Sequence, residues 1–219
     1  MNDHSAAPLL EVRGLTKHFP VHGGVLMRKV GVVHAVDDVS FTLARGQTLG
    51  LVGESGCGKS TVGKTLLRLH EPSQGTVLYE GRNVTKLARS EMRQLRREIQ
   101  IVFQDPLESL NARHTVGKIL EEPFVIHKLG TRAERARRVD ELLERVGLDS
   151  TAAHRFPHEF SGGQRQRIGI ARAIALRPKL VVCDEAVSAL DVSIQSQVIN
   201  LLLELQREMN LAMIFIAHD

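Results

Sequence analysis

The stretch Gly53-Glu54-Ser55-Gly56-Cys57-Gly58-Lys59-Ser60 matches the pattern G-x-x-x-x-G-K-[ST] at every position. It follows a strand-like run, Gln47 to Val52, and leads into a helix-like segment from Thr61. In such a stretch the glycines let the backbone wrap around phosphates, the lysine reaches the β- and γ-oxygens, and the serine hydroxyl can ligate Mg²⁺. The sequence therefore predicts a strand, a phosphate-binding loop that reaches Thr61, and a helix, which together are typical of an α/β fold.

A second candidate phosphate site lies further along the chain, at Ser161-Gly162-Gly163-Gln164. A serine and two glycines at the start of a helix leave backbone N–H groups uncovered, and the helix dipole adds a partial positive charge there. The helix-like segment continues to Ala173. The chain thus carries two separate helix starts that suit a phosphate.

Short apolar runs alternate with helix-like segments over the later part of the chain. The run Leu180 to Cys183 is continuously apolar, as expected of a strand buried on both faces, and it ends in Asp184-Glu185. The alternation predicts an α/β fold with a mixed, largely parallel core sheet, and the early strands predict an additional antiparallel sheet. Strands are expected at Leu9–Arg13, Ala35–Leu43, Gln47–Val52, Thr76–Tyr79, Gln100–Phe103, Leu180–Cys183 and Ala212–Ile216.

The strand signals stop in residues 107–157, which we interpret as a helical subdomain inserted into a nucleotide-binding core of residues 1–106 and 158–219. Thr131-x-x-Glu134 has the spacing of a capping box, and Gly147 stands where the helix is expected to stop. One face of that helix is expected to carry Ala136, Val139, Leu143 and Val146.

The segment of residues 20–31 is Gly-rich and basic and shows no clear periodicity. Such a composition predicts a loop or a wide hairpin turn. The chain contains no internal repeat, and no heptad pattern is long enough for a coiled coil.

The composition is that of an ordinary globular protein, with 219 residues, 42% hydrophobic residues, a net charge of +4 and a pI of about 9.3. The sequence has no apolar run long enough to cross a bilayer and no secretion signal at its start, so we expect a cytoplasmic protein. Basic residues in the stretches Arg89–Arg97 and Arg132–Arg145 alternate with acidic ones, which favours solvated helix faces over a nucleic-acid partner, although an anionic membrane surface is also compatible. Cys57 and Cys183 are expected to be reduced.

The motifs follow one order along the chain: the phosphate loop, Gln104 after a strand, the helix start at Ser161, Asp184-Glu185, Ser188-Ala189-Leu190-Asp191 and His218. In this order they resemble the ATP-binding cassette (ABC) ATPases, a class of P-loop NTPases, over essentially the whole chain. The strings Phe103-Gln104-Asp105-Pro106 and Cys183-Asp184-Glu185-Ala186-Val187-Ser188 are similar to those of the ATP-binding subunits of oligopeptide and dipeptide importers. Ala186 and Val187 stand where the commoner family string has Pro and Thr, and this variant of the string resembles the peptide-importer branch.

The resemblance implies ATP and Mg²⁺ as ligands and gives roles to several polar residues. Asp184, at the carboxyl end of a buried strand, is expected to hold Mg²⁺ through water, and Glu185 is expected to accept a proton from the attacking water. By resemblance, His218 contacts the γ-phosphate and holds that water in line. Gln104 reaches the Mg²⁺ or the water, and the loop after it couples the ATPase to membrane subunits.

Two further residues are assigned by their places in the resembled family. Phe19 follows the first strand at the family's aromatic position and is expected to stack on adenine, with His34 as its rival. Asp191 is expected at the seam of a dimer, and either Ser193 or Asp191 is expected to cap the next helix. The core stripe of that helix is expected to consist of Ile194, Val198, Leu201, Leu202 and Leu205.

Two phosphate-binding helix starts on one chain are explained if ATP lies between the Lys59 loop of one cassette and the Ser161 helix start of another, arranged head to tail. The resemblance therefore implies a second cassette subunit, a different chain in this branch, with two transmembrane permease subunits and an extracytoplasmic solute-binding protein. The expected activity is ATP hydrolysis that powers peptide import, from a peripheral position on the inner face of the cell membrane.

Three alternatives to this interpretation stay open. The solute could be nickel or another small solute, or the chain could be a soluble ABC ATPase of DNA repair or translation, although the segment between Gln104 and Ser161 is short for the coiled coils of repair members. It could also be a nucleotide-binding module without turnover. The sequence ends one residue after His218, whereas the resembled family continues, so we expect the C-terminal part of the family domain to be absent.

Overall fold

The structure of the protein, a computed structural model, describes residues 7–23, 28–105 and 109–217. The chain divides into two compact units, and each is described by itself. Unit 1 extends to Arg96 and also includes the last strand, which begins at Ala212, while unit 2 is Arg97–Leu211.

Unit 1 contains an antiparallel sheet with the strand order β2-β1-β4-β5. β1 (Leu10–Gly23) lies between β2 (Arg28–Leu43) and β4 (Gln74–Tyr79), and the short β5 (Arg82–Asn83) pairs with β4. Apolar side chains of this sheet form part of the core of the unit, because burying them is the main favourable term in folding. They include Leu10, Val12, Leu15, Val77 and Tyr79, each at most 2% exposed.

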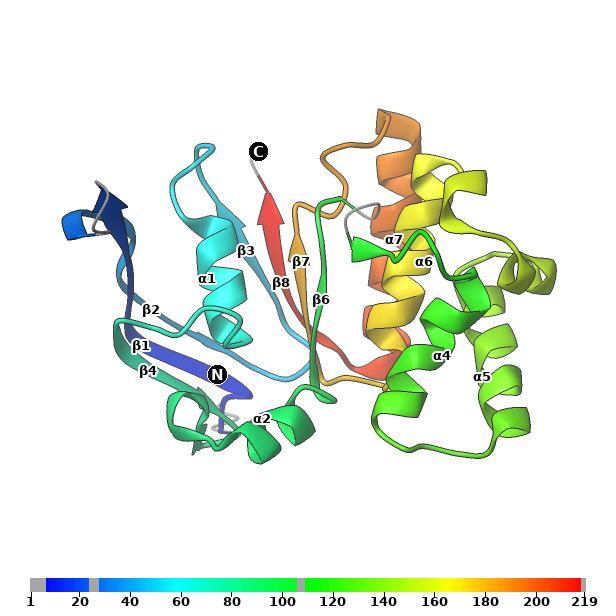
Figure 1. The fold of residues 1–219 in the computed structure, drawn as a ribbon, viewed down its shortest axis with the longest axis horizontal. Helices are drawn as coiled ribbons and strands as arrows, with labels where there is room; N and C mark the ends of the chain where they lie inside the picture. Colours follow the sequence, from blue (N-terminus) through cyan, green and yellow to red (C-terminus); the bar gives the residue numbers. More distant parts are fainter. Residues whose placement is uncertain (1–6, 24–27, 106–108, 218–219) are drawn as a thin grey trace, which may run out of the picture. The chain divides into compact units, whose positions relative to one another are not determined.

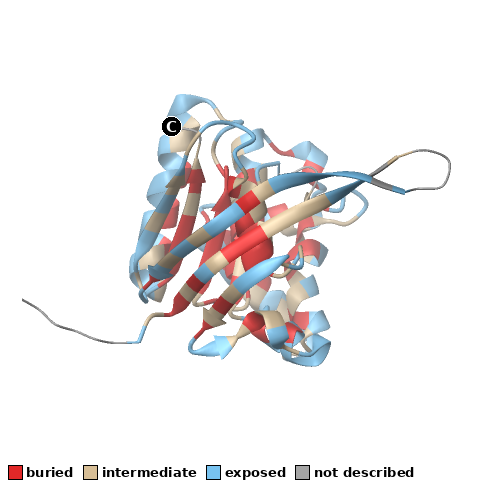
Figure 2. Cartoon of the chain, turned by 90° about the vertical axis from the view of Figure 1, so that its left-hand side faces the viewer, coloured by how far each residue is buried: buried red, intermediate tan, exposed pale blue. Residues whose placement is uncertain are grey.

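Strands β1 and β2 continue beyond the rest of the sheet as a two-stranded ribbon, most of whose described residues are exposed (Figure 2). β1 pairs with β4 only as far as Thr16↔Gln74, but it pairs with β2 as far as Gly23↔Arg28. The prediction of a loop is therefore wrong for residues 20–23 and 28–31, where β-branched valines favour a paired strand. Residues 24–27, in the same predicted loop or hairpin turn, lie outside the described part of the chain.

The phosphate loop of unit 1 joins β3 (Thr48–Val52) to α1 (Lys59–Leu66). β3 pairs in parallel with β8 (Ala212–Ala217), and α1 packs near β8 and β2 (Figure 1). The loop therefore follows the carboxyl end of a parallel strand, which is where α/β folds bind their ligands.

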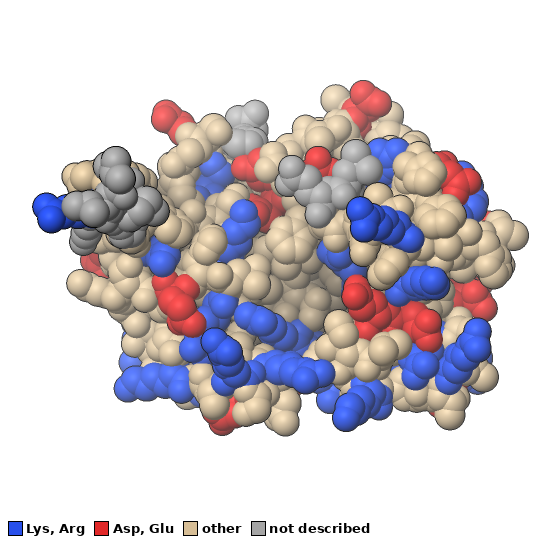
Figure 3. Space-filling model, in the orientation of Figure 1, with Lys and Arg blue, Asp and Glu red and all other residues tan. Residues whose placement is uncertain are grey.

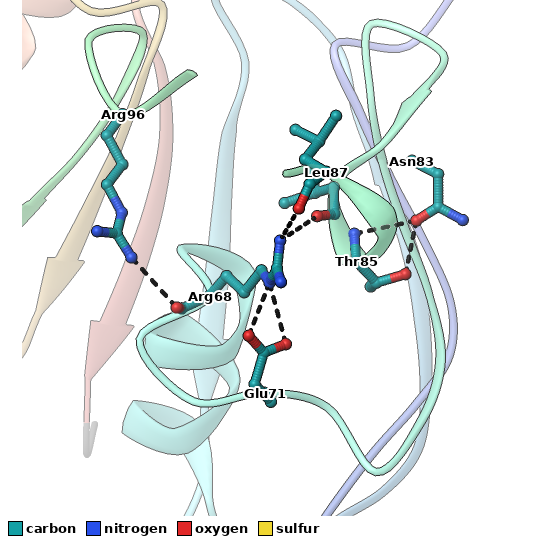
Figure 4. Close-up of polar contacts among 7 residues, drawn as sticks. Arg68, Glu71, Asn83, Thr85, Leu87 and Arg96 are labelled. Atoms are coloured by element: carbon teal, nitrogen blue, oxygen red, sulfur yellow. Dashed lines mark hydrogen bonds and ion pairs between the residues drawn. The ribbon is translucent and has the colours of Figure 1, made fainter. Parts of the chain in front are cut away.

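A polar network fixes the end of α1 against the segment that follows β5 (Figure 4). The Arg68 guanidinium donates to the two carboxylate oxygens of Glu71, at 2.8 and 3.0 Å, and to the carbonyl oxygen of Leu87 at 2.6 Å. Leu87 lies between the short helices η1 (Val84–Lys86) and α2 (Arg89–Leu95). The helix that follows the phosphate loop is thus tied to the segment between η1 and α2 of the same unit.

Unit 2 combines a parallel strand pair with helices. β6 (Ile99–Val102) pairs in parallel with β7 (Leu180–Asp184), in register from Ile99↔Leu180 to Val102↔Cys183. Every residue of β7 is buried, as the sequence predicted, and this burial raises the pKa of the Cys183 thiol to about 12. The helical elements are α4 (Val116–Ile126), α5 (Arg132–Arg145), η2 (Ser150–His154), η3 (Pro157–Glu159), α6 (Gly162–Ile174) and α7 (Val192–Met209).

The helix α5 shows how far local signals determine the structure. Its predicted capping box is confirmed, since Thr131 Oγ1 accepts from the Glu134 amide at 3.3 Å and Glu134 Oε2 accepts from the Thr131 amide at 2.6 Å. Gly147, at a φ of 72°, follows the end of the helix as predicted. The predicted apolar face is wrong at one position, because Ala136 is exposed and Leu142 is buried next to Leu143.

Basic side chains gather over α2 on the face drawn in Figure 3, and over α5 they lie beside acidic ones. In α5, Arg135 pairs with Glu121 at 2.7 Å and Arg137 pairs with Glu141 at 3.5 Å. The basic residues of α5 thus belong to a solvated helix face with paired charges, as the sequence predicted. The two cysteines are free thiols, Cys57 exposed and Cys183 buried, as was also expected.

Candidate functional site

The phosphate loop turns at two glycines in the left-handed region, Gly56 with a φ of 81° and Gly58 with a φ of 96°. A Cβ atom at Gly58 would stand 1.9 Å from the carbonyl oxygen of Ala35 in β2, a distance that no side chain can adopt. At Gly56, no described atom lies within 4 Å of the corresponding position. Gly58 is therefore required by both its conformation and its neighbour, and Gly56 by its conformation alone.

Lys59 begins α1, and its side chain folds back over the loop. Its Nζ donates to the carbonyl oxygens of Gly53 at 2.6 Å and Glu54 at 2.7 Å, and it lies 3.7 Å from Cys57 Sγ. The residue is only 8% exposed, so its ammonium depends on these acceptors. Among the described residues no side chain caps α1, and its first turn has no acidic residue, which leaves this helix N-terminus suited to an anion.

A cavity of about 480 Å³ lies beside this loop within unit 1. Its lining includes Lys59 and Gly58 from the loop and helix, and His34 and Asp37 from β2. Small-molecule sites in proteins have volumes of roughly 300–1,000 Å³, so the cavity can hold a nucleotide-sized ligand.

Phe19 and His34, the two candidates for adenine stacking, have different surroundings. His34 lines the cavity and is exposed. Phe19 is half-buried and meets the ring of His70 edge-on, with centroids 5.3 Å apart, while Lys17 Nζ lies 4.7 Å from its ring centroid. Phe19 is therefore not a core residue, and its ring already has partners within unit 1.

In unit 2, the acidic pair Asp184-Glu185 comes directly at the end of β7. Both residues are buried, with 4% and 8% of their surface exposed. Glu185 has a φ of 50°, in the left-handed region that residues with side chains seldom adopt. Such a conformation costs roughly 1–3 kcal/mol and clusters at functional sites, which supports a specific role for this carboxylate.

Gln104 and Glu185 are connected through Ser188. The Gln104 amide donates to Ser188 Oγ at 3.5 Å, and Ser188 Oγ donates to the Glu185 carbonyl oxygen at 3.0 Å. The structure thus brings together two of the predicted catalytic residues of unit 2. Ser188 received no role from the sequence, although a serine hydroxyl that donates to the carbonyl oxygen three residues before it is a common local pattern.

At the helix start of Ser161, more backbone amides have hydrogen-bond partners than the sequence predicted. Ser161 Oγ accepts from the Gln164 amide at 3.3 Å, and Gln164 Oε1 accepts from the Ser161 amide at 3.0 Å. The prediction of uncovered N–H groups is therefore wrong for these two amides, because Ser-x-x-Gln forms a capping box. A Cβ at Gly163 would stand 2.5 Å from Ile194 Cγ2, so a small residue is needed where α6 meets α7.

Asp191 occupies the N-cap position of α7, but its side chain makes no capping hydrogen bond. The carbonyl oxygen of Asp191 accepts from the amides of Ile194 and Gln195, and Ser193 already lies within the helix. The predicted side-chain cap is therefore wrong for both residues. The predicted stripe is confirmed, with Ile194 half-buried and Val198, Leu201, Leu202 and Leu205 buried.

His218 and Pro106, which the sequence singled out, lie outside the described residues. The remaining predicted residues fall into two groups. Unit 1 holds the loop from Gly53 to Thr61, and unit 2 holds Gln104, the Ser161 helix start, the acidic pair and Asp191.

A parallel strand, a glycine-rich turn, a lysine and an open helix N-terminus define unit 1 as a nucleotide-phosphate-binding structure of the P-loop class. The family profile described as "ABC transporter" matches residues 36–188. The chain belongs to this family.

Two relatives show the extent of the similarity. Over 212 residues the chain is 57% identical to the "Oligopeptide transport ATP-binding protein AppF" of Bacillus subtilis (strain 168), a match that covers 96% of this chain and 64% of the relative. It is 56% identical over 212 residues to the "Glutathione import ATP-binding protein GsiA" of Salmonella typhimurium, covering 97% of this chain and 34% of the relative. The chain thus spans between about a third and two thirds of the length of these relatives.

Solved structures confirm the fold. The ATP-binding cassette MJ0796, described as dimeric and bound to ADP and Pi in a post-hydrolysis state, aligns with a TM-score of 0.83 and 28% identity. The alignment covers 96% of this chain and 88% of that one. The predicted P-loop NTPase fold of the ABC ATPase type is therefore confirmed.

Proposed function

We propose that this chain is the ATP-binding and ATP-hydrolysing part of a peptide importer. The observation that carries the proposal is the 57% identity, over 96% of the chain, to a relative named as an oligopeptide transport ATP-binding protein. Because the chain spans 64% of that relative, its transport activity and its partners are inferred from the family.

Unit 1 would bind the phosphates of ATP. Lys59 would exchange the carbonyl oxygens of Gly53 and Glu54 for phosphate oxygens, and the backbone amides of the loop would add further hydrogen bonds. Phe19 is the proposed adenine-stacking residue, and His34, which lines the cavity, is its alternative. The loop fits an anion because α1 carries neither a side-chain cap nor a first-turn carboxylate among the described residues.

Mg²⁺ would be held by Ser60 and Asp184, with Gln104 as a further ligand. These residues offer hydroxyl, carboxylate and amide oxygens, the donors that Mg²⁺ prefers. A bound Mg²⁺ neutralises charge on the β- and γ-oxygens of the nucleotide. Glu185 would accept the proton of the attacking water, and His218 would hold that water in line.

The second helix start would serve a nucleotide held by a partner. We propose a head-to-tail pair of cassettes, formed by two different chains of one importer. In this pair Ser161, Gly162 and Gly163 of one subunit face the phosphate loop of the other. Asp191 would lie at the seam. Two transmembrane permease subunits and an extracytoplasmic solute-binding protein would complete the importer, with this chain peripheral on the inner membrane face.

In the part of the chain that the structure describes, no helix has the length and apolar character to cross a bilayer. The function is tested by reconstituting the chain with the permease subunits in proteoliposomes. ATP hydrolysis should rise with a peptide-loaded binding protein and should be lost in Lys59→Ala. Stimulation by DNA or ribosomes, with none by the permeases, would instead favour a soluble ABC ATPase.

Glutathione is a second candidate solute, favoured by the 56% identity to the glutathione import protein. The same proteoliposomes can compare oligopeptides, glutathione and nickel as solutes. The solute whose loaded binding protein stimulates hydrolysis identifies the importer. In this proposal the chain makes no contact with the solute, so substitutions in it should not change which solute stimulates hydrolysis.

The head-to-tail arrangement has a separate test, in which two copies of this chain stand in for the two different chains of the importer. Lys59→Ala and Ser161→Arg are placed on different chains and mixed, so that one of the two composite sites keeps both wild-type halves. ATP-dependent pairing in the mixture should exceed that of either variant alone. Equal pairing in all three samples would contradict the arrangement.

A further inference from the structure

Two histidines and an aspartate meet between β1 and β2, and two of them, His34 and Asp37, also line the cavity beside the phosphate loop. His18 and His34 are direct partners in the strand register, and their ring centroids lie 3.9 Å apart. Asp37 lies three residues after His34 in β2. Its Oδ1 is 2.5 Å from His18 Nε2, and its Oδ2 is 3.4 Å from His34 Nδ1. One ligand atom from each residue lies within 4.8 Å of the other two.

The cluster lies at the root of the two-stranded ribbon. The pairing of β1 with β4 ends at Thr16, two residues before His18, and in the described residues β1 then pairs with β2 alone. An isolated pair of strands is only marginally stable in water. A link between His18 and the β2 residues would therefore act where the ribbon loses the support of the third strand.

We propose that His18, His34 and Asp37 form a binding site for a divalent transition-metal cation of the Zn²⁺ type. Two imidazole nitrogens and one carboxylate are a common ligand set for such ions. Ligand atoms around tetrahedral Zn²⁺ stand roughly 3.3 Å apart, given metal–ligand bonds of about 2.0–2.1 Å. The distance from Asp37 to His34 already matches this spacing, and the contact of Asp37 with His18 has to open by less than about 1 Å.

The ligand types of the cluster suit a metal. Oxygens of the Asp37 carboxylate lie 2.5 Å from His18 Nε2 and 3.4 Å from His34 Nδ1, so nitrogen and oxygen donors already face one another. Lys17 and Asp38 are the neighbouring charged residues on the two strands, and their charges are opposite, so neither sign dominates the site.

Because His34 and Asp37 also line the cavity beside the phosphate loop, the test of the metal site uses neither a nucleotide nor an ATPase readout. Zn²⁺ is titrated into the full 219-residue chain by calorimetry at about pH 7.5, where free histidines are neutral. We expect one tight site, with an affinity reduced at least about tenfold in Asp37→Asn and in His34→Ala. His154→Ala, which changes an exposed histidine of η2 in unit 2, is the matched control and should leave the affinity unchanged.

A second readout separates coordination from folding. Co²⁺ bound by the wild type should give the visible absorption of a low-coordinate site, and this absorption should be lost in Asp37→Asn and in His34→Ala. Circular dichroism checks that the variants are folded, and His34, whose side chain is 59% exposed, is the safer substitution. Equal Zn²⁺ affinity in the wild type and in both cluster variants, or no tight binding at all, would overturn the proposal and leave an ordinary histidine–aspartate ion pair.

Discussion

The close approach of Gly58 to β2 predicts that two glycines of the same loop respond very differently to one added methyl group. Gly58 and Gly56 have similar positive φ angles, 96° and 81°, so alanine at either position would have to adopt an unfavourable left-handed conformation. Only at Gly58 would the new Cβ meet another atom, the carbonyl oxygen of Ala35 at 1.9 Å. The substitutions Gly58→Ala and Gly56→Ala therefore isolate that contact.

The expected magnitudes follow from these two geometries. A non-glycine residue in the left-handed region costs roughly 1–2 kcal/mol, which applies to both variants. At Gly58 the contact must also open to about 3.3 Å, which moves the loop or β2 by about 1.4 Å. Overpacking of this kind costs typically about 1–3 kcal/mol more. We therefore expect Gly56→Ala to lose roughly 1–2 kcal/mol of unfolding free energy and Gly58→Ala roughly 2–5 kcal/mol.

The assay is urea-induced unfolding of the wild type and both variants, with ATP affinity measured in parallel by calorimetry. Gly81→Ala, at a φ of 75° with no described atom within 4 Å of its Cβ position, supplies a control outside the loop. Gly81→Ala should resemble Gly56→Ala in stability and the wild type in ATP affinity. If Gly58→Ala lost no more stability than Gly56→Ala, the contact with Ala35 could not be what requires glycine there, and the argument would fail.

Three further predictions concern other parts of the chain. Glu185→Gln should keep ATP affinity but lower turnover by about 10²–10⁴ if this carboxylate is the general base, and unchanged turnover in a steady-state ATPase assay would exclude that role. Arg68→Ala should lower the unfolding free energy by roughly 1–3 kcal/mol in urea denaturation, because it leaves the Leu87 carbonyl without its donor. Burial raises the pKa of Cys183 from 9.0 to about 12, so the unfolded thiol ionises first and stability is lost as pH rises from 9.0 toward 12. Relative to Cys183→Ala, the wild type should lose at most roughly 1.4 kcal/mol per pH unit in this range, and parallel pH curves for the two proteins would contradict it.

The sequence predicted those features that depend on neighbouring residues. The loop from Gly53 to Ser60, the buried strand β7 and the capping box of α5 each rest on residues within a few positions of one another. Periodicity and capping chemistry act over the same short range, which is why these elements could be predicted. The motif order then identified the family, which the profile match confirmed.

The features that the sequence missed depend on contacts between distant residues. Arg68 binds the Leu87 carbonyl, and Gly58 approaches Ala35, because the fold brings these segments together although they are about twenty residues apart in the sequence. The long pairing of β1 with β2 was missed for a related reason, since its glycine and basic residues resemble a loop until the partner strand is known. Ser161 shows the opposite error: its glycine neighbours suggested open amides, while the side chains of Ser161 and Gln164 each accept a hydrogen bond from the other residue's amide.

The hydrogen bonds of Lys59 determine what the phosphate loop gains from a ligand. A largely buried ammonium needs acceptors, and here the loop supplies them from its own backbone, at Gly53 and Glu54. A phosphate that takes over this lysine releases two carbonyl oxygens, which must then be hydrated or find other donors. The gain is therefore the difference between bonds to a charged phosphate and bonds to neutral carbonyls, and ionised acceptors form bonds roughly twice as strong. We therefore expect the phosphate loop to select its ligand by negative charge.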